Sequence, residues 1–175
     1  IIPKTNDETC QKIRKKNEII KNVAFGAMKF TMLNQDSNKE IIFDPEQALS
    51  FEGETGPYVQ YAYARTCSIL KRYKGEVKGK IDFSLLDNKE EKKIVKIIAD
   101  FPEMVEKAAL SYKPSLICRI LLDLSHMFNE YYHKHKILQE DNKRLEDARV
   151  LLVFCVKNVI ENGLNLLSIN VTDEM

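Results

Sequence analysis

The sequence predicts an all-α fold, a bundle of amphipathic helices preceded by a short N-terminal appendage. Three features of composition support this class. The chain has 175 residues, of which 44% are hydrophobic and 30% are charged, so it can bury a core and does not have the composition of a disordered segment. It contains only 6 Gly and 5 Pro, which leaves long segments free of helix-breaking residues. Along those segments apolar residues recur at steps of three and four.

The N-terminal third is predicted to hold two helices, a strand and a short helix. Residues 5–34 are expected to form the two helices, and the polar residues 34–38 a turn. The apolar run 41–43 favours a short strand. Asp44 and Pro45 are typical of a helix start, because Asp caps free backbone N–H groups and Pro suits the first helical position. This helix should end before Gly53.

A long amphipathic helix is predicted from about Pro57 to Tyr73. Its packing stripe consists of Val59, Ala62, Thr66, Ile69 and Tyr73, and its polar stripe of Tyr61, Arg65, Ser68 and Arg72. Two such stripes on one helix indicate one face toward a core and one toward solvent or a ligand. Residues 74–82, rich in Lys and Gly, are expected to be a mobile link.

Three further helices complete the predicted bundle. The first covers 88–110 and should break or kink at Pro102, which cannot donate a backbone hydrogen bond. The second begins at Pro114 or Ser115, and its apolar stripe ends with Tyr131. The last is capped by Asp141 or Asn142 and runs to about residue 167. Its wide apolar face predicts the most buried helix of the bundle, and Gly163 within it predicts a close helix crossing.

Charge and cysteine usage limit the possible functions. The net charge is only +1, and the basic residues form three local clusters: Lys12–Lys16, Lys71–Lys80 and His133–Lys136. A solvated helix face is the ordinary interpretation of each cluster. No apolar run approaches the roughly 20 residues of a membrane span. The scattered Cys10, Cys67, Cys118 and Cys155 favour free thiols over disulfides or a metal site.

A metal site is not expected. His133 and His135 are two residues apart, so on a helix their side chains point about 200° from each other and cannot easily share one ion. No catalytic residue is predicted either.

Two aromatic and basic segments are candidates for binding nucleic acid. The long helix opens with Tyr58, Gln60, Tyr61, Tyr63 and Arg65, and the later segment reads Tyr131-Tyr-His-Lys-His-Lys136. Aromatic rings can stack on unpaired bases while cations bind the phosphates. Tyr131 continues an apolar stripe and should point inward, which leaves Tyr132 to point elsewhere. From the residues alone, a turn followed by a core helix remains an equally simple interpretation of the first segment.

The first segment also carries a family pattern. It reads Phe51-Glu-Gly-Glu-Thr-Gly-Pro-Tyr-Val-Gln-Tyr-Ala-Tyr-Ala-Arg-Thr-Cys-Ser-Ile-Leu70. This resembles the junction between the catalytic and anticodon-binding domains of arginyl-tRNA synthetases, a class I family, where the pattern is F-E-G-x-T-x-P-Y-x-Q-Y-A-x-A-R-x-x-S-I.

A second match lies near the C-terminus. Its three parts are Leu145-Glu-Asp-Ala-Arg149, Asn162-Gly-Leu-Asn-Leu-Leu167 and Asp173-Glu-Met175. They are similar to the motif that names the DALR anticodon-binding domain and to the N-G-x-x-L-L-G and E-R-M segments that follow it. The chain departs from the pattern where the Leu stands one position early, where Ser168 replaces Gly, and where Glu174 replaces a common Arg. The two matches occur in the family's order.

The resemblance implies the C-terminal, tRNA anticodon-binding part of an arginyl-tRNA synthetase. Residues 1–55 would be the tail of the catalytic domain and a linker, and residues 56–175 the DALR helical bundle. The sequence has neither an H-I-G-H-like nor a K-M-S-K-S-like motif. Catalysis with ATP and Mg would therefore belong to the parent enzyme, and this chain would have no cofactor and no activity alone. The expected partners are tRNA for arginine and the catalytic domain in cis, with no membrane, in a cytoplasmic monomer.

The resemblance also implies which residues contact tRNA: Tyr61, Arg65, Tyr112, Lys113, Pro114, Tyr132, Lys134, Lys136 and Met175. The tail 168–171 would bring Met175 back toward Tyr112 and Tyr132. Two other functions stay open. One is a helical protein-interaction module that uses the Met- and Phe-rich helix 115–132. The other is the anticodon domain of a cysteinyl-tRNA synthetase, although the junction 53–65 and the terminal Met favour arginine.

Overall fold

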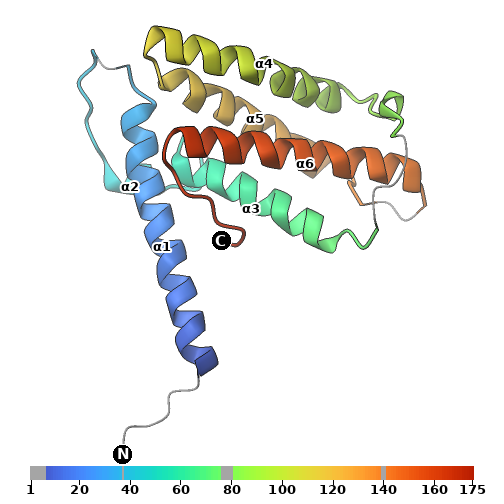
Figure 1. Ribbon diagram of the computed structural model, residues 1–175, viewed down its shortest axis with the longest axis horizontal. Helices are drawn as coiled ribbons and strands as arrows, with labels where there is room; N and C mark the ends of the chain where they lie inside the picture. Colours follow the sequence, from blue (N-terminus) through green and yellow to red (C-terminus); the bar gives the residue numbers. More distant parts are fainter. Residues whose placement is uncertain (1–6, 37, 76–80, 139–140) are drawn as a thin grey trace, which may run out of the picture.

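The computed structural model of the chain describes residues 7–36, 38–75, 81–138 and 141–175. Within these ranges all regular structure is helical, which confirms the all-α prediction (Figure 1). The elements in order are α1 (Asp7–Leu33), α2 (Pro45–Ala48), α3 (Gly56–Arg72), the 3-10 turn η1 (Phe83–Leu85), α4 (Lys89–Ser111), α5 (Ser115–Lys134) and α6 (Lys143–Leu166). None of the described helices has the length and apolarity that a membrane span requires.

Four helices form the bundle. Figure 1 shows α3 and α5 running in one direction and α4 and α6 in the other. Helix α1 packs across one end of the bundle against α3, and its N-terminal half extends away from it (Figure 1). After α6 the tail turns back and passes between α1 and α3. This return of the tail places the C-terminus beside the polar stripe of α3.

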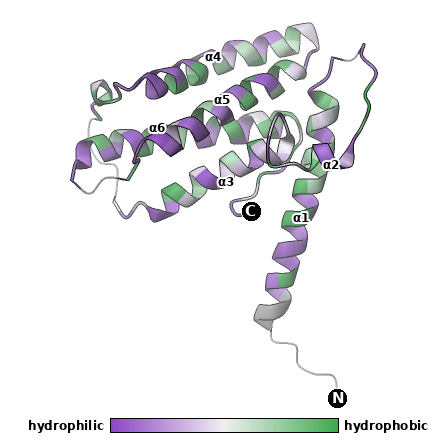
Figure 2. Ribbon diagram, turned by 180° about the vertical axis from the view of Figure 1, so that it is seen from behind, coloured by the Kyte–Doolittle hydropathy of each residue, from purple (hydrophilic) through white to green (hydrophobic). Residues whose placement is uncertain are grey.

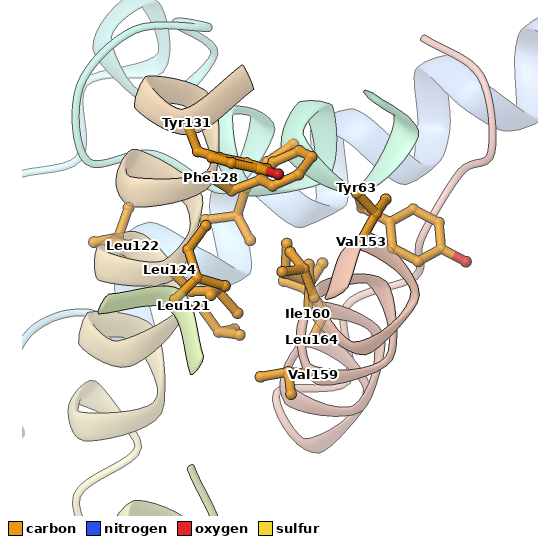
Figure 3. Packing of buried hydrophobic residues seen from close by; sticks show 14 of the residues in the cluster. Tyr63, Leu121, Leu122, Leu124, Phe128, Tyr131, Val153, Val159, Ile160 and Leu164 are labelled. Atoms are coloured by element: carbon orange, nitrogen blue, oxygen red, sulfur yellow. The ribbon is translucent and has the colours of Figure 1, made fainter. Parts of the chain in front are cut away.

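The core is built from the apolar stripes of α3, α5 and α6 (Figure 3). Figure 2 shows hydrophobic and hydrophilic residues alternating along these helices, as amphipathic packing requires. A Cβ atom placed on Gly163 would lie 2.6 Å from Leu121 Cδ2, so the predicted close crossing is confirmed and its partner is α5. Tyr131 is fully buried, as its place on the apolar stripe predicts.

The most buried helix is α3 rather than α6. In α3, 10 of 17 residues are buried, whereas in α6 the number is 11 of 24. The prediction rested on the width of the apolar face of each helix. The sequence does not show how many other elements pack against a helix, and α3 is covered by α1, α5, α6 and the tail.

Residues 7–33 form one helix and not two. Gly26 lies inside this helix at the point where α1 crosses α3, and a Cβ there would lie 2.7 Å from the Gln60 amide. Gly56 meets the same crossing, since its Cβ would lie 2.7 Å from the Gly26 carbonyl oxygen. Both glycines therefore serve close helix packing, and neither breaks the helix.

The predicted strand is wrong, and so is the predicted break at Pro102. Residues 41–43 form no strand, because no other described segment offers them a partner, and Ile42 is 89% exposed. Helix α4 continues through Pro102 without a break. Pro102 is exposed, so water can replace the hydrogen bond that proline cannot make.

Several local predictions are confirmed. Asp44 caps α2, and its side chain accepts from the backbone N–H of Glu46 at 2.9 Å. Asn142 caps α6 by accepting from Leu145 N–H at 3.2 Å. Cys67 and Cys118 are buried free thiols, and Cys155 is a half-buried one. Cys10 lies outside the described side chains, and residues 76–80 of the predicted link lie outside the described residues.

Candidate nucleic-acid interface

The polar stripe of α3 opens into a hollow of about 330 Å³, which we call the aromatic pocket. It lies between α3, the end of α5 and the C-terminal tail. Its lining residues are Tyr61, Ala64, Arg65, Ser68, Ile69, Arg72, Tyr132, Glu174 and Met175. The pocket therefore joins four of the predicted site residues, which come from three separate parts of the sequence.

Arg65 occupies the centre of the aromatic pocket between two tyrosine rings. Its guanidinium carbon lies 4.7 Å from the ring centre of Tyr61 and 4.8 Å from that of Tyr132. One terminal nitrogen donates to Asn129 Oδ1 at 2.8 Å, and the other donates to the Tyr61 hydroxyl at 3.0 Å. Cation–π contact and these two hydrogen bonds fix the plane of the guanidinium. Phe51 packs edge-on against Tyr61.

The tail is docked, as predicted. Ile169 is almost fully buried. The Asn170 carbonyl accepts from Gln60 Nε2 at 2.8 Å, and the Asn170 amide donates to Asn22 Oδ1 at 3.1 Å. Lys29 donates to the Ser168 carbonyl. These contacts hold the tail between α1 and α3 and place Met175, which is 40% exposed, at the aromatic pocket.

The predicted turn 112–114 lies at the far end of α5. Ser115 is the first residue of α5. Because an α-helix rises about 1.5 Å per residue, Tyr132 lies about 26 Å further along the helix axis. The tail thus brings Met175 to Tyr132 but not to Tyr112, and that part of the prediction is wrong, because one straight helix separates the two. Tyr112 is 90% exposed and ends α4 in the left-handed conformation, with φ of 54°. Lys113 and Pro114 border a smaller hollow beside it.

The two lysines after Tyr132 are exposed, but Lys134 already has partners. Its amine lies 3.1 Å from a carboxylate oxygen of Glu90 and 2.5 Å from one of Glu130. His135 lies 3.2 Å from the other Glu90 oxygen. The backbone N–H of Glu90, followed by Lys134 and His135, lowers the pKa of Glu90 to about 2. Lys136 is exposed, and its carbonyl accepts from Arg149.

The sequence interpretation missed a buried network around Glu91, whose side chain is fully buried in α4. One carboxylate oxygen accepts from Arg149 Nε at 2.8 Å and from the Tyr131 hydroxyl at 3.1 Å. The other accepts from the backbone N–H of Asn88 at 3.1 Å. The available signal was Asn88 followed three residues later by Glu91, the spacing of a capping box.

The motif Leu145–Arg149 thus has a structural role in this bundle. Arg149 ties α6 to α4 and α5 through Glu91 and Tyr131. Asp147 accepts from the hydroxyl of Tyr73, at the end of α3, at 2.6 Å. Burial, together with the Asp147 carboxylate, raises the pKa of Tyr73. One turn of α6 therefore holds the other three helices of the bundle.

The geometry defines a class of site. Half-exposed aromatic rings beside a fixed guanidinium and further cations suit planar groups that stack and anions that accept hydrogen bonds, as in single-stranded nucleic acid. The model of the DALR anticodon binding domain matches residues 59–175. The chain belongs to this family.

Its relatives are much longer proteins. The chain is 40% identical over 169 residues to an arginine–tRNA ligase of Clostridium botulinum (strain Alaska E43 / Type E3), covering 97% of this chain and 30% of that protein. It is 40% identical over 163 residues to one of Halothermothrix orenii, covering 93% and 29%. The chain thus spans about 30% of the length of the curated relatives that it matches.

Solved structures agree. Arginyl-tRNA synthetase of Thermus thermophilus superposes with a TM-score of 0.79 at 37% identity, covering 87% of this chain and 26% of that one. The synthetase of Plasmodium falciparum also superposes with a TM-score of 0.79, covering 97% of this chain and 31% of that one. Its identity is 22%, so this second match shows the fold alone.

Proposed function

We propose that this chain is the anticodon-recognition part of an arginine–tRNA ligase and that it binds the anticodon arm of tRNA for arginine. The observation that carries the proposal is Arg65, held flat between Tyr61 and Tyr132 with Met175 beside it. Anticodon bases leave their stack easily, and a protein reads such bases with aromatic platforms and hydrogen bonds to their edges.

Each pocket residue has a separate task in this proposal. Tyr132 is half-buried at the rim of the pocket, so its exposed part offers an aromatic surface against which an unstacked base can lie. The guanidinium of Arg65 supplies donors to a base edge or a phosphate. Met175 is flexible and polarisable, so it fills the space beside the base.

The remaining predicted residues would contact other parts of the RNA. Tyr112, Lys113 and Pro114 lie too far from Tyr132 to touch the same nucleotide. Lys134 and Lys136, which follow Tyr132 in the sequence, would contact backbone phosphates, although Lys134 must exchange Glu90 or Glu130 for a phosphate. The footprint would therefore extend along α5.

Catalysis belongs, in this proposal, to a domain outside these residues, which would use ATP and Mg to attach arginine to tRNA. Residues 1–55 would connect to that domain in cis, and 56–175 would form the recognition unit, in a cytoplasmic monomer. Among the described residues, no three His, Cys, Asp or Glu side chains gather to hold a metal ion. We expect no arginine-dependent pyrophosphate exchange from the purified chain. Clear activity would contradict the proposal that catalysis resides in another domain.

The structure also bears on the protein-interaction alternative. That alternative needs the Met- and Phe-rich face of α5 to be free for a partner. Phe128 is fully buried and Met127 packs against the core, so the bundle itself covers this face. The proposed RNA contact on α5 is Tyr132, a half-buried residue at the edge of this face near the end of the helix.

The test is a titration with purified tRNAs. We expect the chain to bind tRNA for arginine more tightly than tRNA for cysteine, with an affinity that falls as salt rises. Tyr132→Ala should lose about 1–3 kcal/mol of binding free energy, the range for one stacked base, while circular dichroism stays native. Lys96→Gln, on the exposed face of α4, is the matched control. Unchanged affinity in Tyr132→Ala would remove Tyr132 as a base platform, and a preference for the cysteine tRNA would favour the cysteinyl alternative.

A further inference from the structure

The last acidic residue of the chain bridges two cationic segments that are far apart in sequence. The Glu174 carboxylate accepts from Lys15 of α1 through one oxygen, at 2.8 Å, and from Lys71 of α3 through the other, at 3.3 Å. The two basic clusters that contain Lys15 and Lys71 therefore meet at one point.

This point adjoins the aromatic pocket. Glu174 itself lines the pocket, together with Met175 and Arg72. Two amines thus hold one carboxylate at the edge of the site where the proposed function places an RNA base, and a third cation, Arg72, lines the same pocket. The hydrogen bonds from Lys15 and Lys71 lower the pKa of Glu174, so it is charged at neutral pH.

The Glu174 contact can be exchanged for another anion. The side chains of Lys15 and Glu174 are 63% and 55% exposed, and exposed ion pairs are weak. Among the described residues, the last backbone–backbone hydrogen bond of the tail is made by Ile169 N–H. Val171 still packs against the core and Thr172 is buried, so the part of the tail that can move without unfolding a helix is its exposed end, Glu174 and Met175.

We propose that the gap between Lys15 and Lys71 is a binding site for a backbone phosphate of RNA, and that Glu174 fills this site in the free protein. The inference rests on the proposed function. Two amines that hold one oxygen each of a carboxylate can hold two oxygens of a phosphate in the same way, and Arg72 can supply a further donor. RNA would then displace Glu174 as it arrives and would move the tail that carries Met175.

A purely structural role for Glu174 makes the opposite prediction. If the ion pairs serve only to hold Met175 at the aromatic pocket, loss of the charge weakens RNA binding. If Glu174 competes with phosphate, loss of the charge strengthens it. The sign of the change separates the two roles.

The first experiment compares Glu174→Gln with the wild type in binding the arginine tRNA at fixed salt. The amide keeps the size of the side chain and can still accept from the amines, but it removes the competing charge. We expect about threefold to tenfold tighter binding, since two exposed ion pairs no longer oppose the phosphate. The slope of log K against log salt should become steeper by about 0.7 for each amine released. Equal or weaker binding would overturn the proposal.

Asp173→Asn is the matched control. It removes the same charge one residue away, from a carboxylate that accepts from the Cys67 thiol and forms no ion pair within the described residues. We expect a smaller gain than for Glu174→Gln. Equal gains would show a general charge effect of the tail and would overturn a specific site.

The second experiment tests the amines. Lys15→Gln and Lys71→Gln, each combined with Glu174→Gln, should cancel the gain and flatten the salt dependence, whereas Lys96→Gln should not. An unrelated single-stranded RNA should show the same gain with Glu174→Gln, because a phosphate carries no sequence information.

The outcomes separate this proposal from the proposed function. If the gain occurs but the chain prefers no tRNA and Tyr132→Ala leaves binding unchanged, the proposed function fails and the phosphate site stands. If Tyr132→Ala weakens binding but the gain is absent, the phosphate site alone fails.

Discussion

Two clusters of this molecule contain the same residue types but differ in surroundings. The buried network joins Arg149 to Glu91 and Tyr131, with the Arg149 and Glu91 side chains 6% and 0% exposed. The aromatic pocket joins Arg65 to Tyr61 and Tyr132, and Tyr61 is 38% exposed. In the network a carboxylate neutralises the arginine, whereas in the pocket the amide of Asn129 only orients it.

The difference shows how burial assigns a role to an arginine and a tyrosine. Arg149 is 5% exposed and is paired with a carboxylate, so its guanidinium is out of reach of a ligand. Arg65 has no carboxylate partner within the described residues and remains partly accessible. A charged group at a half-exposed site loses little hydration free energy, since water still reaches it. The network is thus suited to hold helices and the pocket to bind an anion or a base.

The largest expected effect separates the two arginines by stability. Arg149→Ala leaves the Glu91 carboxylate buried without its cation, and breaking a buried ion pair costs about 3–5 kcal/mol of folding free energy. Arg65→Ala should cost less than about 1 kcal/mol. Urea denaturation at pH 7 measures both. Similar losses for the two variants would break the comparison.

A second effect separates them by binding. Arg65→Lys keeps the charge but loses the flat guanidinium between the two rings and its paired donors. We expect about tenfold weaker binding of the arginine tRNA with nearly unchanged stability, measured by filter binding and urea denaturation. Asn129→Ala should give a smaller loss of the same kind, because Arg65 then lacks one of its two orienting hydrogen bonds. Tenfold weaker binding accompanied by lost stability would mean that the pocket is also structural.

The sequence could predict most of this fold, but of the two clusters only the aromatic pocket. Periodicity and caps located α2 and the bundle helices, because Asp44 and Asn142 act within one turn of the chain. The merging of residues 7–33 into one helix depended on Gly26 meeting α3, which is a tertiary contact. Tyr61 and Arg65 were predicted together because they are four residues apart on one helix face.

The buried network could not be predicted in the same way. Its members Glu91, Tyr131 and Arg149 come from three helices, and each alone reads as an ordinary charged or aromatic residue. The family pattern marked the segment 145–149 but gave no partner for Arg149. The separation of Tyr112 from Tyr132 likewise required knowledge that α5 is one straight helix between them.

Glu90 gives a smaller effect that depends on pH. Its pKa is lowered to about 2 in the folded chain, from an ordinary value of 4.5. A carboxyl whose folded pKa is depressed contributes stability above the unfolded pKa and loses it as pH falls toward the folded pKa. Glu90→Gln should therefore be less stable than the wild type at pH 7, and the difference should shrink between pH 4.5 and about 2. Urea midpoints across this range measure it, and a difference that does not depend on pH would show that the charge of Glu90 is not its source.

The smallest effect concerns the backbone that carries Met175 to the aromatic pocket. Ser168 ends α6 with φ of 56°, in the left-handed region, where the family pattern has Gly and where a residue with a Cβ is strained by roughly 1–2 kcal/mol. Ser168→Gly relieves this strain but makes the unfolded chain more flexible, so we expect a net gain of up to about 1 kcal/mol in folding free energy. Tyr112, with φ of 54°, is the matched position at the end of α4. Tyr112→Gly should gain similar stability while weakening RNA binding, since its exposed ring is lost, whereas Ser168→Gly should leave RNA binding unchanged. If Ser168→Gly also weakens binding, the strained turn itself sets the position of Met175, and the tail belongs to the binding site as much as Arg65 does.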